Sequence, residues 1–86
     1  MSVPVVTLYG KPGCHLCDDA RAAVAAALAD RPAELREVDV SLDPSLERAY
    51  GERIPVVAVD GEERFQYFVE VRALARLLDG LERSTD

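Results

Sequence analysis

Two cysteines, Cys14 and Cys17, are the residues of this chain whose type and spacing most clearly indicate chemistry. Residues three apart share one side of a helix, with Cβ atoms roughly 5–6 Å apart, which is near the reach of a disulfide. The pair can therefore cycle between two thiols and one disulfide. Zinc sites use the same cysteine spacing, but mononuclear zinc needs about four ligands. Besides the cysteines and a poorly placed His15 the chain offers only carboxylates, so we expect no metal site in a single subunit.

The cysteines lie where an apolar strand is predicted to give way to a helix. Residues 5–9 are rich in β-branched and aromatic side chains, and the loop Gly10-Lys11-Pro12-Gly13 follows them. Apolar residues then recur at helical spacing, at Leu16, Ala20, Val24, Ala27 and Leu28. The cysteine motif therefore opens a helix, which Arg31-Pro32 should end.

The start of a helix favours negative charge, because its unpaired N–H groups and its macrodipole face an anion there. A thiolate at Cys14 is stabilised in this position, and Lys11 can add to the effect. Asp18 and Asp19 act against it, so we expect a modest net shift toward thiolate. Cys17 lies one turn further, where the helix should cover it. Cys14 is therefore predicted to attack a substrate disulfide and Cys17 to resolve the mixed disulfide.

The middle of the chain predicts a second strand and a short helix. Residues 35–40 alternate between apolar and charged side chains, as in a strand with one polar side near a sheet edge. Asp43-Pro44 is a helix-start signal and Gly51 a stop signal. The helix between them should turn Leu46, Ala49 and Tyr50 inward.

The remaining residues predict a hairpin and a final helix. Residues 54–59 form a strand, Asp60-Gly61 a tight turn, and residues 62–68 the returning strand. An apolar helical face follows, made of Val71, Leu74, Ala75, Leu77, Leu78 and Leu81. We expect residues 81–86 to form a frayed tail. The order βαβαββα predicts an α/β fold with a four-stranded mixed sheet and three helices, in one domain spanning residues 1–86.

Composition limits the classes of partner. Apolar residues make up 49% of the chain and charged residues 30%, which is typical of a globular domain. The net charge of −6 argues against nucleic acid or an anionic membrane as a partner, because phosphates require a basic surface. Neither a secretory signal nor a membrane-spanning run is evident. We therefore expect a cytoplasmic monomer, and in the cytoplasm a close cysteine pair is usually catalytic.

The chain resembles a glutaredoxin, the smallest version of the thioredoxin fold, over residues 3–80. Three features carry the resemblance: the run from Tyr9 to Cys17 after the first strand, Ile54-Pro55 before the third, and the order of elements. Within the thioredoxin superfamily, its pattern resembles the small bacterial glutaredoxin-like proteins more than the typical glutaredoxins. The resemblance implies that Pro55 is cis and faces the dithiol, with Ile54 offering backbone groups to an extended substrate. It also implies that Lys11 steers an anionic thiol substrate, with help from Arg53.

Two departures from the glutaredoxin pattern bear on glutathione. His15-Leu16 stands between the cysteines, where glutaredoxins carry Pro-Tyr. Residues 68–71 lack the glycine pair whose N–H groups hold the glutamyl carboxylate of glutathione, and Glu70 would repel that carboxylate. We therefore predict an oxidoreductase that reduces protein or low-molecular-weight mixed disulfides and serves cell redox homeostasis and electron transport. It needs no bound cofactor, and its electron donor is glutathione, another small thiol or a reductase.

Two other functions remain open at this stage. A dimer with Cys14 from each chain and two small thiols could hold a [2Fe–2S] cluster, or the domain could be a redox-inert adaptor. Tyr9 and His15 are candidate modulators of the dithiol. Protonated His15 would favour a Cys14 thiolate, although a purely solvent-facing histidine explains the sequence equally well. Tyr9, Phe65, Tyr67 and Phe68 are expected in the core or on strand faces.

Overall fold

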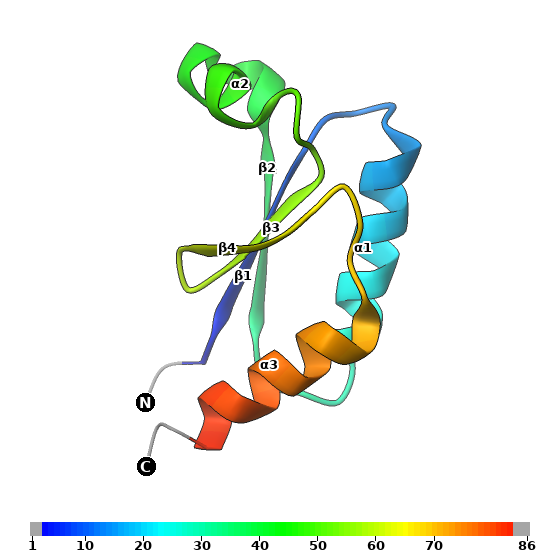
Figure 1. The fold of residues 1–86 in the computed structure, drawn as a ribbon, viewed down its shortest axis with the longest axis vertical. Helices are drawn as coiled ribbons and strands as arrows, with labels where there is room; N and C mark the ends of the chain where they lie inside the picture. Colours follow the sequence, from blue (N-terminus) through cyan, green and yellow to red (C-terminus); the bar gives the residue numbers. More distant parts are fainter. Residues whose placement is uncertain (1–2, 84–86) are drawn as a thin grey trace.

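A computed structural model describes residues 3–83 of the chain (Figure 1). Its four-stranded sheet has the order β2-β1-β3-β4. The central strand β1 (Val5–Gly10) pairs in parallel with β2 (Glu34–Asp39) and antiparallel with β3 (Val56–Val59). Strand β4 (Glu62–Gln66) pairs antiparallel with β3. The predicted mixed sheet is confirmed, and β2 lies at an edge as expected.

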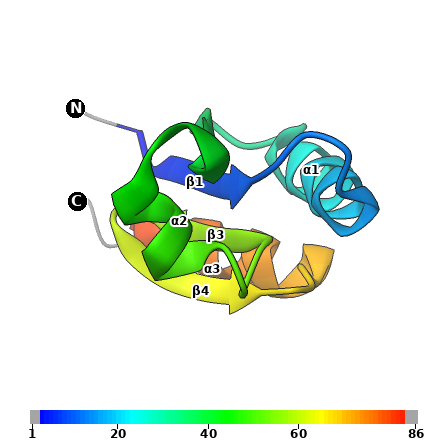
Figure 2. The ribbon, with the colours of Figure 1, turned by 90° about the horizontal axis from the view of Figure 1, so that it is seen from above.

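Three α-helices and one short 3-10 helix complete the described part of the fold. Helix α1 (His15–Leu28) and helix α3 (Val71–Arg83) pack against each other, whereas α2 (Pro44–Tyr50) lies at the end of the sheet where β1 stops (Figures 1 and 2). The 3-10 helix η1 (Val40–Leu42) connects β2 to α2. This arrangement is the α/β fold that the order of elements predicted, and it is the minimal thioredoxin fold that the resemblance implied.

One apolar core joins the sheet to the two long helices. Its buried members come from β1, β3, α1, α3 and the residue Val69, and include Val6, Leu8, Val24, Val57, Leu74 and Leu78. All four residues of β3 are buried, as expected of a strand inside the sheet. The hairpin turn is also as predicted: Asp60 and Gly61 have φ of 50° and 86°, the pair of positive angles that a type I′ turn requires.

Several predicted boundaries were wrong. Val40 belongs to η1 rather than to the preceding strand, β3 begins at Val56 rather than at residue 54, and β4 ends at Gln66. Tyr67 and Phe68 are 48% and 71% exposed, so they are not core residues. Local apolar content predicted continued strands, but the backbone leaves the sheet at both ends of the hairpin.

Two helices also differ from expectation. Helix α2 buries no residue completely, and Ala49 is exposed, because this short helix rests on η1 and the sheet end rather than on the core. Helix α3 continues through Gly80 to Arg83, so residues 81–83 are helical and not frayed. Residues 84–86 of the predicted tail lie outside the described residues. No helix within residues 3–83 has the length and apolar character to cross a membrane.

Candidate active site

Cys14 is the N-cap of α1. Its backbone is extended (φ −96°, ψ 111°), and its Sγ accepts a hydrogen bond from the Cys17 backbone N–H at 3.3 Å. The Cys14 carbonyl accepts the Asp18 N–H at 3.1 Å, which is the first bond of the helix. The sulfur therefore faces the unpaired amides of the first turn, where negative charge is stabilised. The side chain remains partly open to solvent, as the sequence predicted.

Cys17 lies one turn further and is completely buried. Its sulfur packs over the last residue of β1: a Cβ placed on Gly10 would lie 2.9 Å from the Cys17 Sγ. Glycine is therefore needed at position 10, because any side chain would displace the buried thiol. Sequence inspection treated Gly10 as the start of a loop and missed this contact.

Burial raises the pKa of the Cys17 thiol to about 11, with a smaller contribution from its hydrogen bond to Cys14. A backbone hydrogen bond from Lys11 and the charge of Arg21 act in the opposite direction but do not offset burial. At neutral pH Cys17 is therefore a protonated thiol inside the protein. The exposed member of the pair, Cys14, is the one that an external disulfide can reach.

Pro55 has the cis peptide bond that the resemblance implied. It is buried and immediately precedes β3, whose residue Val56 pairs with Tyr9. Continuing this register places Pro55 beside Gly10, against which the Cys17 sulfur packs. The Pro55 carbonyl accepts the Tyr67 N–H at 2.7 Å. By contrast, the backbone N–H and carbonyl of Ile54 have no partner among residues 3–83 and stay free for an added strand.

The two cations assigned to substrate binding are engaged within the protein. Lys11 Nζ lies 2.5 Å from Glu47 Oε1 on α2. Arg53 Nη1 donates to Glu63 at 2.7 Å and to Gln66 at 3.2 Å, and the hydrogen bond to Glu63 raises the pKa of the Arg53 guanidinium. These contacts join α2 and the following loop to their neighbours. A substrate role for Lys11 and Arg53 stays a prediction.

Of the two candidate modulators, Tyr9 is a packing residue and His15 faces solvent. The Tyr9 ring stacks on the Tyr50 ring with centroids 4.3 Å apart. The Cζ atom of the Arg53 guanidinium lies over the Tyr50 ring, 5.4 Å from its centroid. Burial, followed by the neighbouring Tyr50, raises the pKa of Tyr9. His15 is the exposed first residue of α1. Tyr9 thus anchors α2 to the strand that leads into the dithiol.

Glu70 has a role that the sequence prediction missed, because it caps the N-terminus of α3. Its two carboxylate oxygens accept the backbone N–H groups of Arg72 at 3.1 Å and of Ala73 at 2.9 Å. These amides are the kind of donor that would otherwise bind an external anion. The sequence did contain a signal for this cap, because an acidic residue directly precedes the apolar run of the helix. From the sequence alone, we expected only that Glu70 would repel a carboxylate.

Comparison with known proteins agrees with this geometry. Residues 5–79 match the model of the glutaredoxin-like domain (DUF836). This chain belongs to the glutaredoxin-like domain family. An uncharacterised protein of Mycobacterium tuberculosis is 35% identical to this glutaredoxin-like domain, in an alignment that covers 99% of this chain and 90% of the relative.

Solved structures share the fold. The X. campestris protein XcR50 is 37% identical, with a TM-score of 0.73, and the match covers 87% of this chain and 96% of that one. Protein Ne2328 of Nitrosomonas europaea is 25% identical, with a TM-score of 0.77 and coverage of 91% and 94%. A mutant thioredoxin from Halobacterium salinarum is also 25% identical, with a TM-score of 0.64 and coverage of 90% and 73%. The glutaredoxin-like domain therefore has a thioredoxin-like fold with two nearby cysteines.

A pocket of this glutaredoxin-like domain lies on the β2 side of the β1–α1 loop. This pocket of about 330 Å³ is lined in part by Lys11, Arg21, Glu37 and Asp39, and by neither cysteine. Arg21 pairs there with Glu37 and, at 2.7 Å, with Asp18. The pocket is therefore separate from the surface through which a disulfide would reach Cys14. Within residues 3–83, His, Cys, Asp and Glu form no group of three or more that could hold a metal ion.

Proposed function

We propose that this glutaredoxin-like domain is a thiol-disulfide oxidoreductase in which Cys14 attacks and Cys17 resolves. One observation carries the proposal: an accessible thiol caps a helix directly beside a completely buried second thiol. The helix terminus stabilises negative charge on the first sulfur, while burial keeps the second sulfur protonated until it is needed.

The reaction then follows two exchanges. The Cys14 thiolate attacks one sulfur of the substrate disulfide, forms a Cys14–substrate disulfide and releases the other substrate sulfur as a thiolate. Cys17 gives up its proton and attacks the Cys14 sulfur, which forms the Cys14–Cys17 disulfide and releases the second substrate thiol. The substrate has gained two electrons and the domain has lost two. A reducing thiol or a reductase restores the dithiol.

Glutathione is the weaker electron donor and substrate in this proposal. In glutaredoxins, the amides at the start of the last helix hold the glutamyl carboxylate of glutathione. Here the Glu70 carboxylate accepts two of the corresponding N–H groups and adds a negative charge. Protein disulfides and other small-thiol conjugates do not need free amides at the start of α3 to bind a carboxylate. We place the reaction in the cytoplasm, where disulfides of this kind are transient.

The chain's own residues do not fit a resident iron–sulfur cluster. Such a cluster needs four thiolates or equivalent ligands, whereas one chain presents Cys14 and buries Cys17. A cluster would require a second chain and added thiols. Protein purified without air should therefore show no visible-range absorption band. A strong band in such a preparation would favour cluster binding instead.

Turnover of a simple aromatic disulfide tests the proposal. Reduction should be faster with thioredoxin reductase as the electron source, or with dithiothreitol, than with glutathione and glutathione reductase. Cys14→Ser should reduce no disulfide with any source. If the unmodified domain and Cys14→Ser were equally inactive with all three sources, the domain would be a redox-inert adaptor.

A further inference from the structure

Apolar side chains lie along one side of the dithiol. We call Leu16, Ile54, Tyr67 and Phe68 the apolar rim; Ile54 is half-buried and the other three are exposed. Leu16, in the first turn of α1, is 44% exposed, and Phe68 is 71% exposed. The β4–α3 connection that carries Phe68 runs beside α1 in both ribbon views (Figures 1 and 2). Hydrogen bonds from Tyr67 to Pro55 and Glu52 tie this connection to the cis-proline loop.

Near the dithiol and the apolar rim, carboxylates without a cationic partner leave an excess of negative charge. Three cations near the dithiol are engaged with carboxylates: Lys11 with Glu47, Arg21 with Asp18 and Glu37, and Arg53 with Glu63.

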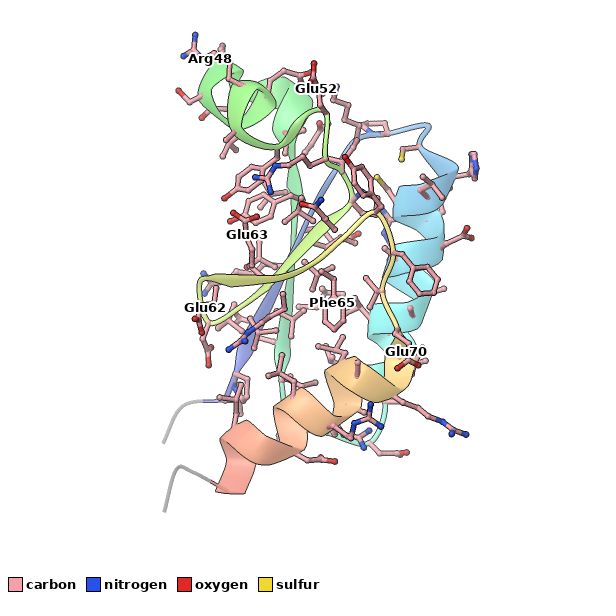
Figure 3. The ribbon with its side chains drawn as sticks, viewed as in Figure 1. Arg48, Glu52, Glu62, Glu63, Phe65 and Glu70 are labelled. Carbon is pink, nitrogen blue, oxygen red and sulfur yellow. The ribbon has the colours of Figure 1, made fainter. Side chains whose placement is uncertain are left out.

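Two carboxylates there, those of Asp19, one turn beyond Leu16 on α1, and of Glu52, have no cationic partner among the described residues. Figure 3 shows Glu52 on the connection that follows α2, whereas Glu70 lies well away from it, at the start of α3. The cation Arg48, in contrast, lies at the outer end of α2 (Figure 3). The apolar rim therefore has an acidic border.

From this combination we infer the class of substrate, on the basis of the function proposed above. The domain docks an extended polypeptide whose disulfide cysteine is flanked by an apolar residue and by lysine or arginine. The apolar neighbour packs on Leu16 and Phe68, and the basic residues face Asp19 and Glu52. The unpaired backbone groups of Ile54 can add the segment as a strand, which a small thiol without an extended backbone cannot exploit.

The same charges disfavour acidic small thiols. Complementary charge raises association rates and selects partners more than it adds to final affinity. Such steering between exposed charges weakens when salt shortens the Debye length to a few ångströms. Selectivity for basic peptides should therefore be a low-salt effect on kcat/KM, whereas the contribution of Phe68 should persist at high salt.

The test uses two synthetic peptides of equal length. Each carries one cysteine in a mixed disulfide with a coloured aromatic thiol, next to a phenylalanine and flanked by two arginines or by two glutamates. Dithiothreitol supplies the two electrons, and release of the aromatic thiol gives kcat/KM. At low ionic strength we expect the arginine peptide to react roughly five- to tenfold faster, and about equally fast at 1 M salt. Uncatalysed exchange is subtracted from both.

Matched variants separate this surface from general charge and apolarity. Asp19→Asn combined with Glu52→Gln should cut the preference to about twofold or less. Asp30→Asn removes an exposed carboxylate at the other end of α1 and should leave the preference unchanged. Phe68→Ser should slow both peptides severalfold, whereas Leu42→Ser, which removes an 81% exposed leucine from η1, should slow neither.

Equal rates for the two peptides at low salt, or a preference that Asp30→Asn reduces as much as Asp19→Asn with Glu52→Gln, would overturn the inference. Failure of the proposed function looks different. In that case the domain and Cys14→Ser would release the aromatic thiol at the same rate from both peptides.

Discussion

The two long helices of this domain begin in different ways. Helix α1 is capped by the sulfur of Cys14, a weak acceptor that takes the Cys17 N–H at 3.3 Å. Helix α3 is capped by the Glu70 carboxylate, whose two oxygens each accept a backbone N–H. The N-terminus of α1 can therefore stabilise a negative charge that forms on Cys14. The N-terminus of α3 already holds the permanent charge of the Glu70 carboxylate.

This difference shows how one fold separates chemistry from recognition. A helix N-terminus stabilises any nearby anion. What a given helix terminus can bind therefore depends on which side chain caps it. At α1 the Cys14 sulfur occupies this position, and at α3 the Glu70 carboxylate does. In the function proposed above, the thiol chemistry of the glutaredoxin pattern is retained at α1, while the Glu70 carboxylate occupies amides that would otherwise bind a glutathione carboxylate.

The largest effect should come from exchanging the two cysteines for serine one at a time. Cys14→Ser removes the attacking sulfur, and dithiol turnover should fall by more than about a thousandfold. Cys17→Ser retains the attack but not the resolution, so it should accumulate mixed disulfides that mass spectrometry detects. A Cys14→Ser protein that trapped partners, beside an inert Cys17→Ser protein, would mean that the roles of the two sulfurs are reversed.

Opening the start of α3 should give the next largest effect. Glu70→Gly removes the charge and the internal acceptor, and Glu70→Gln removes the charge alone. A charge-assisted carboxylate site contributes about 1.5–3 kcal/mol, so Glu70→Gly should lower KM for glutathione roughly tenfold to a hundredfold. Glu70→Gln should give a smaller gain.

Asp30→Asn, which changes the net charge equally from a remote position, is the control for Glu70. It should leave KM for glutathione unchanged. Efficient use of cellular glutathione by the unmodified domain, with no gain in Glu70→Gly, would show that the occupied helix terminus does not limit this substrate.

The sequence predicted the surroundings of the dithiol at the start of α1 better than those of Glu70 at the start of α3. Cysteine spacing, the preceding strand and Pro55 are local signals, and each agrees with the structure. The fold followed from periodicity and turn residues, such as Asp60-Gly61, for the same reason. The contacts of Gly10 with Cys17 and of Lys11 with Glu47 join residues far apart along the chain, so no local pattern indicates them.

Exposure was the least predictable property. Tyr67 and Phe68 continue an apolar strand pattern, but β4 ends before them and Phe68 projects into solvent. Whether such a residue is covered depends on where the backbone leaves the sheet, which is a tertiary property. Similarly, Ala49 faces solvent because α2 rests on the sheet end rather than on the core.

The buried sulfur of α1 should also make stability depend on pH. Folding raises the pKa of Cys17 to about 11, above the value of 9.0 for an unperturbed thiol. The stabilisation is therefore fully present below about pH 9 and is lost as pH rises toward 11. Under reducing conditions, the free energy of unfolding should fall over this interval by about 2 kcal/mol more than in Cys17→Ala. Urea titrations at several pH values measure it, and parallel pH curves for the two proteins would contradict burial of an ionisable thiol.

The smallest expected effect concerns the charge beside the start of α1. Glu47→Gln would release Lys11 from its ion pair, and the freed ammonium should increase the reactivity of Cys14 toward iodoacetamide. Exposed ion pairs contribute about 0–1 kcal/mol, so the rate should rise by no more than about fivefold. Glu52→Gln removes a nearby carboxylate that holds no cation and should change the rate less. A larger effect of Glu52→Gln would exclude the Lys11–Glu47 pair as the cause.

The central claim is that the two sulfurs differ in accessibility and proton affinity, and alkylation of the reduced domain tests it most directly. Trace iodoacetamide at neutral pH, followed by peptide mass spectrometry, gives a separate rate for each cysteine. Cys14 should react at least about tenfold faster than Cys17, because Cys17 is buried and protonated. Equal rates, or faster modification of Cys17, would contradict the account.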